Sequence, residues 1–410
     1  MISRAHAVSL RNSQVGVLAQ SGDVARFSFD ADYWERENRD VLGLWFEDNP
    51  RASPRATLRL PAWFSNLLPE GRLREWIAID RNVSAEREME LLLRVGRDLP
   101  GAVTVAEDGA EGMADAWGDI ENPRANPVES PIWKFSLAGV GLKFSMLASG
   151  DKLSLPAEHE FGDWIVKLPE PSHRNVPENE FLIMNLARAA GIEVPETRLV
   201  HRSDLERLPD NVWPNGEEYA FAIRRFDRAD GERVHIEDLA QVRGFYPHEK
   251  YSGSFETVAA LLYRGVDLSS LDEFVRRMTF NLLVGNGDAH LKNWSVIYEF
   301  GRRARISPAY DLVSTIPYFA SGEEDLGLKF GGQKRFSAVT RFDFERMAKR
   351  LGVGQKSMLA IVDEVIERVL GEVGGLAPLT DLPQFPRKVE DHATAIAAQL
   401  GVRPNTVPIV

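Results

Sequence analysis

Three polar residues in the second half of the chain have the types and the spacing that phosphoryl transfer requires. Asp288 and Asn293 form the pattern D-x-x-x-x-N within segment 286–293 (N-G-D-A-H-L-K-N), and Asp311 follows in a later strand-like segment. Phosphoryl transfer needs a carboxylate that orients or deprotonates the attacking hydroxyl, and an Asp plus an Asn that hold Mg²⁺ on the phosphates. This order and spacing are typical of protein-kinase catalytic loops. The three residues are therefore candidates for these tasks.

Other interpretations of this segment stay open. Asp and Asn are common in turns and helix caps, so each residue taken alone could have only a local structural role. Asp288, His290 and Asp311 could instead bind zinc, although no second His stands at the i+4 spacing of common zinc motifs. Because His290 and Lys292 add further polar side chains after a buried-looking helix, where desolvation is costly, we favour a catalytic loop.

A glycine-containing loop and a strand lysine are the candidates for nucleotide binding. Segment 136–143 reads S-L-A-G-V-G-L-K, and its glycines let backbone N–H groups approach phosphate oxygens. Lys167 ends an apolar strand predicted over 164–168, where kinases place the lysine that pairs with nucleotide phosphates. Glu180, in the following helix, could orient that lysine through an ion pair. A plain hairpin at 136–143 and a lysine on an edge strand are the alternatives.

The elements that must position these residues fall into three units. Residues 1–106 read as a small α/β module, and residues 107–130 read as an acidic linker or long loop. Residues 131–228 are predicted to be a β-rich, ATP-binding lobe and residues 229–410 a helical catalytic lobe. We therefore predict an α+β, two-lobed protein-kinase-like fold with an additional N-terminal module, and a ligand cleft between the lobes.

Periodicity and terminal residues predict individual elements within these units. Helices are expected over 73–79, 86–95, 177–190, 342–351, 356–370 and 386–400, and strands over 7–10, 15–18, 26–29, 132–135, 142–146, 164–168 and 220–225. Gly96 stands where a helix C′ glycine belongs. Ser269 or Ser270 is expected to cap a further helix that ends at Gly285.

Composition excludes several classes of protein. Of 410 residues, 44% are hydrophobic and 27% charged, as in folded globular proteins. The absence of cysteine excludes disulfides, thiolate metal sites and cysteine nucleophiles. A net charge of −12 disfavours direct nucleic-acid binding, and the arginines at 302–305 are interpreted as a solvated turn. No apolar stretch approaches the roughly 20 residues that span a bilayer, and no secretory signal is evident. We expect a soluble cytoplasmic protein without membrane association.

Several motifs together resemble those of the HipA family, the serine/threonine kinase toxins of bacterial type II toxin–antitoxin pairs. The resemblance spans nearly the whole chain and is carried by segments 63–71 (W-F-S-N-L-L-P-E-G), 136–143 (S-L-A-G-V-G-L-K), 235–241 (H-I-E-D-L-A-Q), 287–295 (G-D-A-H-L-K-N-W-S) and 310–311 (Y-D). Two departures occur. Gly141 replaces the usual Gln of the glycine loop, and segment 96–101 only partly matches the family's G-G-D-x-x-G stretch.

The resemblance implies a role for each matched residue. Asp288 would be the catalytic base, and Asn293 and Asp311 would hold Mg²⁺. Arg224, Arg225 and Phe226 would form the hinge beside the adenine, mostly through their backbone. The residues implied to bind ATP are Ala138, Gly139, Val140, Gly141, Leu142, Lys143, Lys167, Arg224, Arg225, Phe226, His290, Lys292, Asn293, Tyr310 and Asp311. Ser136 matches the position at which family members phosphorylate themselves and become inactive.

The resemblance also implies a function and partners. The chain would be an ATP- and Mg²⁺-dependent protein kinase toxin that phosphorylates a translation enzyme, such as an aminoacyl-tRNA synthetase. It would bind a HipB-like helix-turn-helix antitoxin and contact DNA only through it. The alternatives are a catalytically weak co-repressor partner of that antitoxin and a small-molecule kinase, because choline- and aminoglycoside-type kinases have a similar Asp-to-Asn loop. The complete Asp288, Asn293 and Asp311 set argues against the first alternative, and the Ser136 loop against the second.

Overall fold

The computed structural model of the chain describes residues 3–96, 98–106, 142–150, 152–156, 161–208, 212–213, 216–229, 231–320 and 324–401. Some of the expectations above lie outside the described residues. These are the linker over 107–130, the strand over 132–135, and the site residues Ser136, Ala138, Gly139, Val140 and Gly141.

The N-terminal module is built on one antiparallel sheet. Its five strands lie in the order β4-β3-β2-β1-β5, with β1 at Ser3–Leu10, β2 at Ser13–Ser21, β3 at Val24–Phe29, β4 at Arg55–Thr57 and β5 at Val103–Val105. The helices of the module are α1 (Leu44–Asp48), α2 (Ala62–Ser65), α3 (Gly71–Asp80) and α4 (Glu88–Val95). The strands and helices predicted for this region are confirmed.

Gly96 follows α4 for a different reason from the one expected. A C′ glycine usually has positive φ, but Gly96 caps the helix with φ −61°. A Cβ built at this position would lie 2.7 Å from the carbonyl oxygens of Leu92 and Val105. Glycine is therefore required because β5 packs closely on the end of α4, and left-handed backbone has no part in it.

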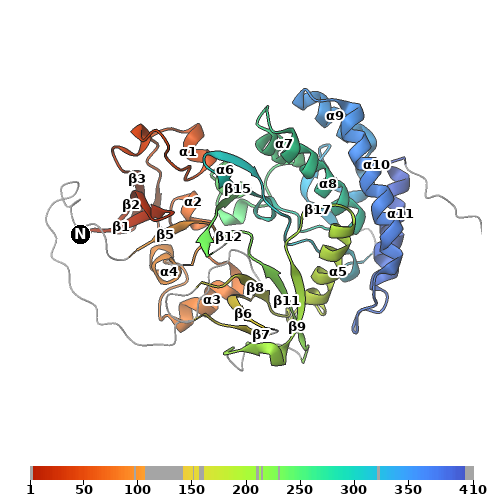
Figure 1. The fold of residues 1–410 in the computed structure, drawn as a ribbon, viewed down its shortest axis with the longest axis horizontal. Helices are drawn as coiled ribbons and strands as arrows, with labels where there is room; N and C mark the ends of the chain where they lie inside the picture. Colours follow the sequence, from red (N-terminus) through yellow and green to blue (C-terminus); the bar gives the residue numbers. More distant parts are fainter. Residues whose placement is uncertain are drawn as a thin grey trace, which may run out of the picture.

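The β-rich lobe contains a six-stranded sheet in the order β10-β7-β6-β8-β11-β9. Its strands are β6 (Lys143–Ser149), β7 (Lys152–Ser154), β8 (Trp164–Lys167), β9 (Thr197–His201), β10 (Leu205–Glu206) and β11 (Tyr219–Arg224). Helix α5 (Val176–Ala189) begins after Asn175 and stops before Gly191, whose φ is +84°, as the sequence predicts. In Figure 1, α5 lies between this sheet and the C-terminal helices.

The helical lobe ends the chain. Its helices are α6 (Leu239–Arg243), α7 (Phe255–Tyr263), α8 (Leu268–Val284), α9 (Arg341–Leu351), α10 (Gln355–Glu372) and α11 (Phe385–Gln399). The 3₁₀ turns within the described ranges are Tyr33–Glu35, Arg202–Asp204, Pro247–Glu249, Leu291–Asn293, Ile316–Tyr318, Phe336–Ala338 and Val373–Gly375. None of the helices in the described ranges has the length and apolar character needed to cross a bilayer.

Two features of this lobe differ from expectation. Asp267, and neither Ser269 nor Ser270, is the N-cap of α8, because its carboxylate accepts a 3.1 Å bond from the Ser270 N–H. The lobe also contains short strands that were not predicted: β14 (His235–Asp238), β15 (Ser295–Phe300), β16 (Arg303–Ile306), β17 (Asp325–Phe330) and β18 (Gln333–Arg335), besides the pair β12 (Arg228–Ala229) and β13 (Glu232–Arg233) at its border.

The hydrophobic cores do not follow the three units. One cluster joins the N-terminal module to the β-rich lobe, including Phe27 and Phe64 from the module and Phe144 and Val166 from the lobe. The other cluster contains the helical lobe and also the buried side of α5. Figure 1 shows the same relationship, since α3 of the module lies beside β6 and β8. The N-terminal module is therefore packed as part of the kinase-like body.

Candidate active site

A cleft of about 350 Å³ lies where the three units meet. This volume is in the range of small-molecule and cofactor sites. Every predicted site residue that the structure describes lines it: Leu142, Lys143, Lys167, Arg224, Arg225, Phe226, Asp288, His290, Lys292, Asn293, Tyr310 and Asp311. Asn66 and Glu70 of the N-terminal module also line the cleft, and the residue patterns assigned them no chemistry.

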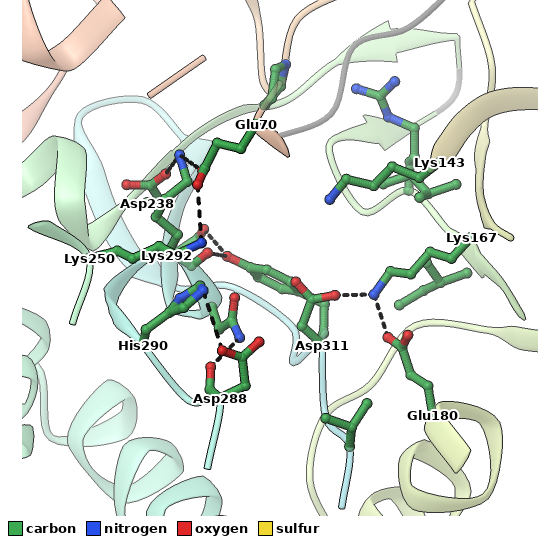
Figure 2. Close-up of a pocket in the computed structure, with 18 of the residues that line it drawn as sticks. Glu70, Lys143, Lys167, Glu180, Asp238, Lys250, Asp288, His290, Lys292 and Asp311 are labelled. Atoms are coloured by element: carbon green, nitrogen blue, oxygen red, sulfur yellow. Dashed lines mark hydrogen bonds and ion pairs between the residues drawn. The ribbon is translucent and has the colours of Figure 1, made fainter. Parts of the chain in front are cut away.

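Sheet register brings two lysines to one wall of the cleft. Strands β6 and β8 pair antiparallel with Lys143 opposite Lys167, and directly opposed residues project to the same face of a sheet. Figure 2 shows both amino groups pointing into the space above Asp311. Burial lowers the pKa of Lys143 to about 8, and the nearby Asp311 carboxylate opposes that effect. The pair forms a cationic wall suited to phosphate oxygens.

Lys167 is held by two carboxylates. Its amine donates to Glu180 Oε1 at 2.6 Å and to Asp311, as drawn in Figure 2, so the predicted pairing with Glu180 is confirmed. Burial alone would lower the pKa of Lys167, but the two carboxylates outweigh it and raise that pKa. Burial would also raise the pKa of Asp311, but Lys167 and Lys143 hold it well below its usual range. Both groups are thus in the charged states that phosphate and cation binding require.

The catalytic loop is fixed by hydrogen bonds that begin at the end of α8. The helix stops at Gly285, with φ +63°, and Asn286 then donates to Asn281 Oδ1 at 2.9 Å. The Asp288 N–H donates to Asn286 Oδ1 at 3.1 Å, and Asn293 Nδ2 donates to the Asp288 carbonyl at 2.8 Å. Asn293 thus uses its amide nitrogen within the loop, which leaves its amide oxygen as the atom that could bind a cation.

Asp311 has an unusual backbone conformation. Its φ is +54°, which is uncommon for residues other than glycine, although Asp tolerates it better than most. The preceding Tyr310 donates to the Lys292 carbonyl at 2.9 Å, which ties the segment to the catalytic loop. Mg²⁺ typically takes one or two protein oxygens together with phosphate oxygens and water. The Asp311 carboxylate and the Asn293 amide oxygen fit that requirement, whereas in the described ranges no three His, Cys, Asp or Glu side chains group as metal ligands, so the zinc alternative gains no support.

The buried amine of Lys292 contacts oxygen atoms of the protein itself. Its Nζ lies 3.0 Å from both the carbonyl and the side-chain oxygen of Asn66, and 3.3 Å and 3.4 Å from carboxylate oxygens of Glu70 and Asp238. Its side chain is only 4% exposed. Register explains part of this arrangement, because Asp238 of β14 pairs with Ser295 of β15 directly after the loop. The predicted contact of Lys292 with nucleotide stays a prediction.

The guanidinium of Arg225 likewise points away from the cleft. It is fully buried and donates to Asp227 at 2.8 and 2.9 Å and to Asp98 at 3.0 Å. Arg228 adds a 2.8 Å bond to Asp98. The charges outweigh burial and hold the pKa of Asp227 well below its usual range. Only the backbone of Arg225 is therefore available to a nucleotide, as the hinge prediction supposes, and that prediction stays untested.

Sequence reasoning missed two residues that line the cleft, Glu70 of the N-terminal module and Tyr251 of the helical lobe. Glu70 pairs with Lys250 Nζ at 3.1 Å, and the Tyr251 hydroxyl donates to Asp288 Oδ1 at 2.6 Å. Burial and the Asp288 carboxylate raise the pKa of Tyr251, so the hydroxyl keeps its proton. Glu70 lies within segment 63–71, whose only sequence signal is its resemblance to the family motif. No sequence pattern distinguishes Tyr251 from other tyrosines.

The lysine–glutamate pair faces an Asp-to-Asn loop and a second Asp across one cleft, which is the arrangement expected of a protein-kinase-like phosphotransferase. Comparisons with known proteins agree. The family profile described as the HipA-like C-terminal domain matches residues 135–373, and that described as the HipA N-terminal domain matches residues 6–106. The chain belongs to the HipA family of kinases.

Individual relatives support the same assignment. Putative kinase Y4dM of Sinorhizobium fredii is 42% identical over 356 residues, which cover 83% of this chain and 84% of that protein. The serine/threonine-protein kinase toxin HipA of Shewanella oneidensis is 25% identical over 370 residues, which cover 81% of this chain and 79% of that protein. The structure from the complex of Shewanella oneidensis HipA, HipB and operator DNA has the same fold, with a TM-score of 0.74 at 22% identity, covering 97% of this chain and 98% of that chain. The predicted family, fold class and enzyme class are confirmed.

Proposed function

We propose that the chain is an ATP- and Mg²⁺-dependent serine/threonine protein kinase toxin. The observation that carries this proposal is that Lys167 joins Glu180 and Asp311 in one cleft with Asp288 and Asn293. In this arrangement the lysine binds nucleotide phosphates and the Asp311 and Asn293 oxygens hold the cation. Bound Mg²⁺ neutralises charge on the phosphates. Glu180 keeps the lysine amine directed at the cleft.

The transfer step follows from these positions. The substrate hydroxyl oxygen attacks the γ-phosphorus and its proton passes to the Asp288 carboxylate, while the bond from phosphorus to the bridging oxygen breaks and ADP leaves with that electron pair. Lys143 and Lys167 neutralise the negative charge on the transferring and leaving phosphates. The adenine is assigned to the backbone at Arg224–Phe226. Ser136, with the loop that includes Ala138–Gly141, is proposed as the autophosphorylation site.

A partner and a substrate class complete the proposal. The relative from Shewanella oneidensis was solved with HipB and operator DNA, and its fold covers nearly all of this chain. We infer a HipB-like helix-turn-helix antitoxin as partner, with DNA contacted only through it. The substrate is assigned to translation enzymes such as aminoacyl-tRNA synthetases, which places the activity in the cytoplasm.

Radiolabelled ATP tests the proposal. The full chain is incubated with [γ-³²P]ATP, Mg²⁺ and a panel of purified aminoacyl-tRNA synthetases, and Asp288→Asn serves as the inactive control. We expect label on one synthetase and on Ser136 with the wild-type chain and on neither with the variant. Label on the synthetase without label on Ser136 would refute self-inactivation alone. If the wild-type chain transfers no phosphate to any protein and hydrolyses no ATP, the kinase assignment itself is wrong.

A further inference from the structure

A single hydrogen bond links the proposed catalytic carboxylate to a tyrosine outside the catalytic loop. The Tyr251 hydroxyl donates to Asp288 Oδ1 at 2.6 Å, and the tyrosine ring stands edge-on against His290 with ring centroids 5.0 Å apart. The residue is 44% exposed, so its hydroxyl has access to water and does not need this bond to satisfy a buried donor. The contact therefore calls for an explanation beyond core packing.

The segment that carries Tyr251 is bonded both to the catalytic loop and to the N-terminal module. Lys250, its neighbour, accepts a 3.0 Å backbone bond from the Leu291 N–H, inside the catalytic loop. The Lys250 amine pairs with Glu70 Oε2 at 3.1 Å. The other Glu70 oxygen lies 3.3 Å from Lys292, which belongs to the catalytic loop. Figure 2 shows Glu70 descending from the N-terminal module between these two lysines.

Charge and burial strengthen the ion pairs of Glu70 with Lys250 and Lys292. Burial would raise the pKa of Glu70, but Lys292 and Lys250 outweigh it and lower that pKa, so the carboxylate is ionised between the two amines. Charge-assisted bonds of this kind are shorter and stronger than neutral ones. One carboxylate thus contacts both the catalytic loop, through Lys292, and the segment whose Tyr251 binds Asp288.

We propose that Tyr251 is a positioning residue for the Asp288 carboxylate and that Glu70 of the N-terminal module anchors it. Tyr251 binds one carboxylate oxygen, so Asp288 presents its other oxygen to the acceptor hydroxyl in a fixed orientation. The N-terminal module thereby takes part in phosphotransfer through its effect on Asp288. This inference rests on the proposed kinase function and goes beyond it by giving the module a task in the reaction.

Turnover of ATP tests the inference without knowledge of the acceptor. For the full chain with Mg²⁺, phosphate released to water plus phosphate transferred onto the chain itself is counted. Tyr251→Phe removes only the hydroxyl. Because one hydrogen bond to a charged group is lost, we expect turnover to fall by up to about tenfold. ATP affinity and the thermal midpoint should stay unchanged. Merely structural damage would lower all three quantities together, and that result would overturn the inference.

Matched variants separate the anchor from general effects. Glu70→Gln should lower turnover in the same direction, and the double variant should lose less than the product of the two single losses, because both act through one connection. Tyr219→Phe, on an exposed strand tyrosine, and Glu90→Gln, on the exposed face of α4, should match the wild-type chain. If Glu70→Gln does not fold, Tyr251→Phe still decides the question.

The possible failures are distinguishable. Wild-type turnover in Tyr251→Phe means that the hydroxyl positions nothing. Turnover above wild type means that it blocks the acceptor position, and either result overturns the inference while the kinase assignment stands. Absence of turnover in the wild-type chain overturns the proposed function and this inference with it.

Discussion

The Lys292 ammonium group lies 3.0 Å from the side-chain oxygen of Asn66, so the loop after α2 in the N-terminal module directly holds the catalytic loop. A second buried set of hydrogen bonds also joins the N-terminal module to the rest of the protein. Glu237 accepts bonds from the Leu44 N–H at 2.8 Å and from Trp63 Nε1 at 3.0 Å. Separation of the module would remove Asn66 from Lys292 and two donors from Glu237. Loss of hydrogen-bond partners from buried polar groups costs more than the bonds themselves contribute.

Asp98 is the residue of the module whose loss should most affect stability. Asp98→Ala removes a carboxylate that accepts from Arg225 and Arg228 inside a closed ion cluster. Breaking a buried pair typically costs 3–5 kcal/mol, and because Asp227 remains we expect a loss of about 3 kcal/mol. Urea unfolding monitored by tryptophan fluorescence measures the change.

An exposed ion pair on the same module provides the control for that measurement. Glu90 pairs with Arg87 at 2.8 Å on the surface of α4, where solvent screening leaves little net stabilisation. Glu90→Ala should leave the urea midpoint unchanged. A shift for Asp98→Ala no larger than the control's would show that the buried cluster contributes no net stability.

Asp288→Asn should abolish phosphotransfer and spare nucleotide binding. The amide keeps the shape of the side chain but cannot accept the proton of the attacking hydroxyl. Turnover should fall by at least about a hundredfold, the lower end of the usual range for loss of a general base. Calorimetric titration with ATP and Mg²⁺ should give the wild-type affinity. Parallel loss of binding and turnover would contradict the assignment of Asp288 to the acceptor.

The parts of this site that sequence could predict depend on short-range patterns. D-x-x-x-x-N is contained within one loop, and Lys167 and Glu180 lie at the end of one strand and in the next helix. Glu70, Asp98 and Tyr251 became visible only in three dimensions, because their contacts join segments far apart in the chain. No pattern encodes the positive φ of Asp311, which tertiary contacts impose.

Short-range patterns also failed where several residues satisfied the same rule. Asp267, Ser269 and Ser270 are all good N-cap types, and their position relative to the buried stripe of α8 selects Asp267. Strands β14 to β16 escaped prediction because charged and polar residues interrupt them. Glu237 and Asp238, which would argue against a buried strand, are instead paired with the N-terminal module and with Lys292.

Asp311→Asn should weaken ATP binding only when Mg²⁺ is present. The variant removes the anionic ligand expected to hold the cation but keeps a neutral oxygen at the same place. We expect wild-type affinity to fall at least about tenfold on removal of Mg²⁺ with EDTA, and the variant to bind equally weakly in both conditions. If the ATP affinity of the variant still depends on Mg²⁺ as strongly as that of the wild-type chain, Asp311 is excluded as the Mg²⁺ ligand.

Lys143 should make ATP binding depend on pH. Burial lowers its pKa to about 8, so the amine is charged below pH 8 and neutral above it. A terminal phosphate has a second pKa of about 6 and is largely ionised above about pH 7. Affinity should therefore change little between about pH 7 and 7.5 and then fall by up to about tenfold per pH unit above pH 8. Lys143→Arg keeps its charge throughout this pH range and should remove the fall in affinity.

Calorimetry with a non-hydrolysable ATP analogue measures both pH profiles. Lys152→Arg, on an exposed lysine of β7, is the control that should follow the wild-type curve. Identical slopes for the wild-type chain and Lys143→Arg would show that the titrating group lies elsewhere, and that Lys143 does not bind the phosphates through its charge.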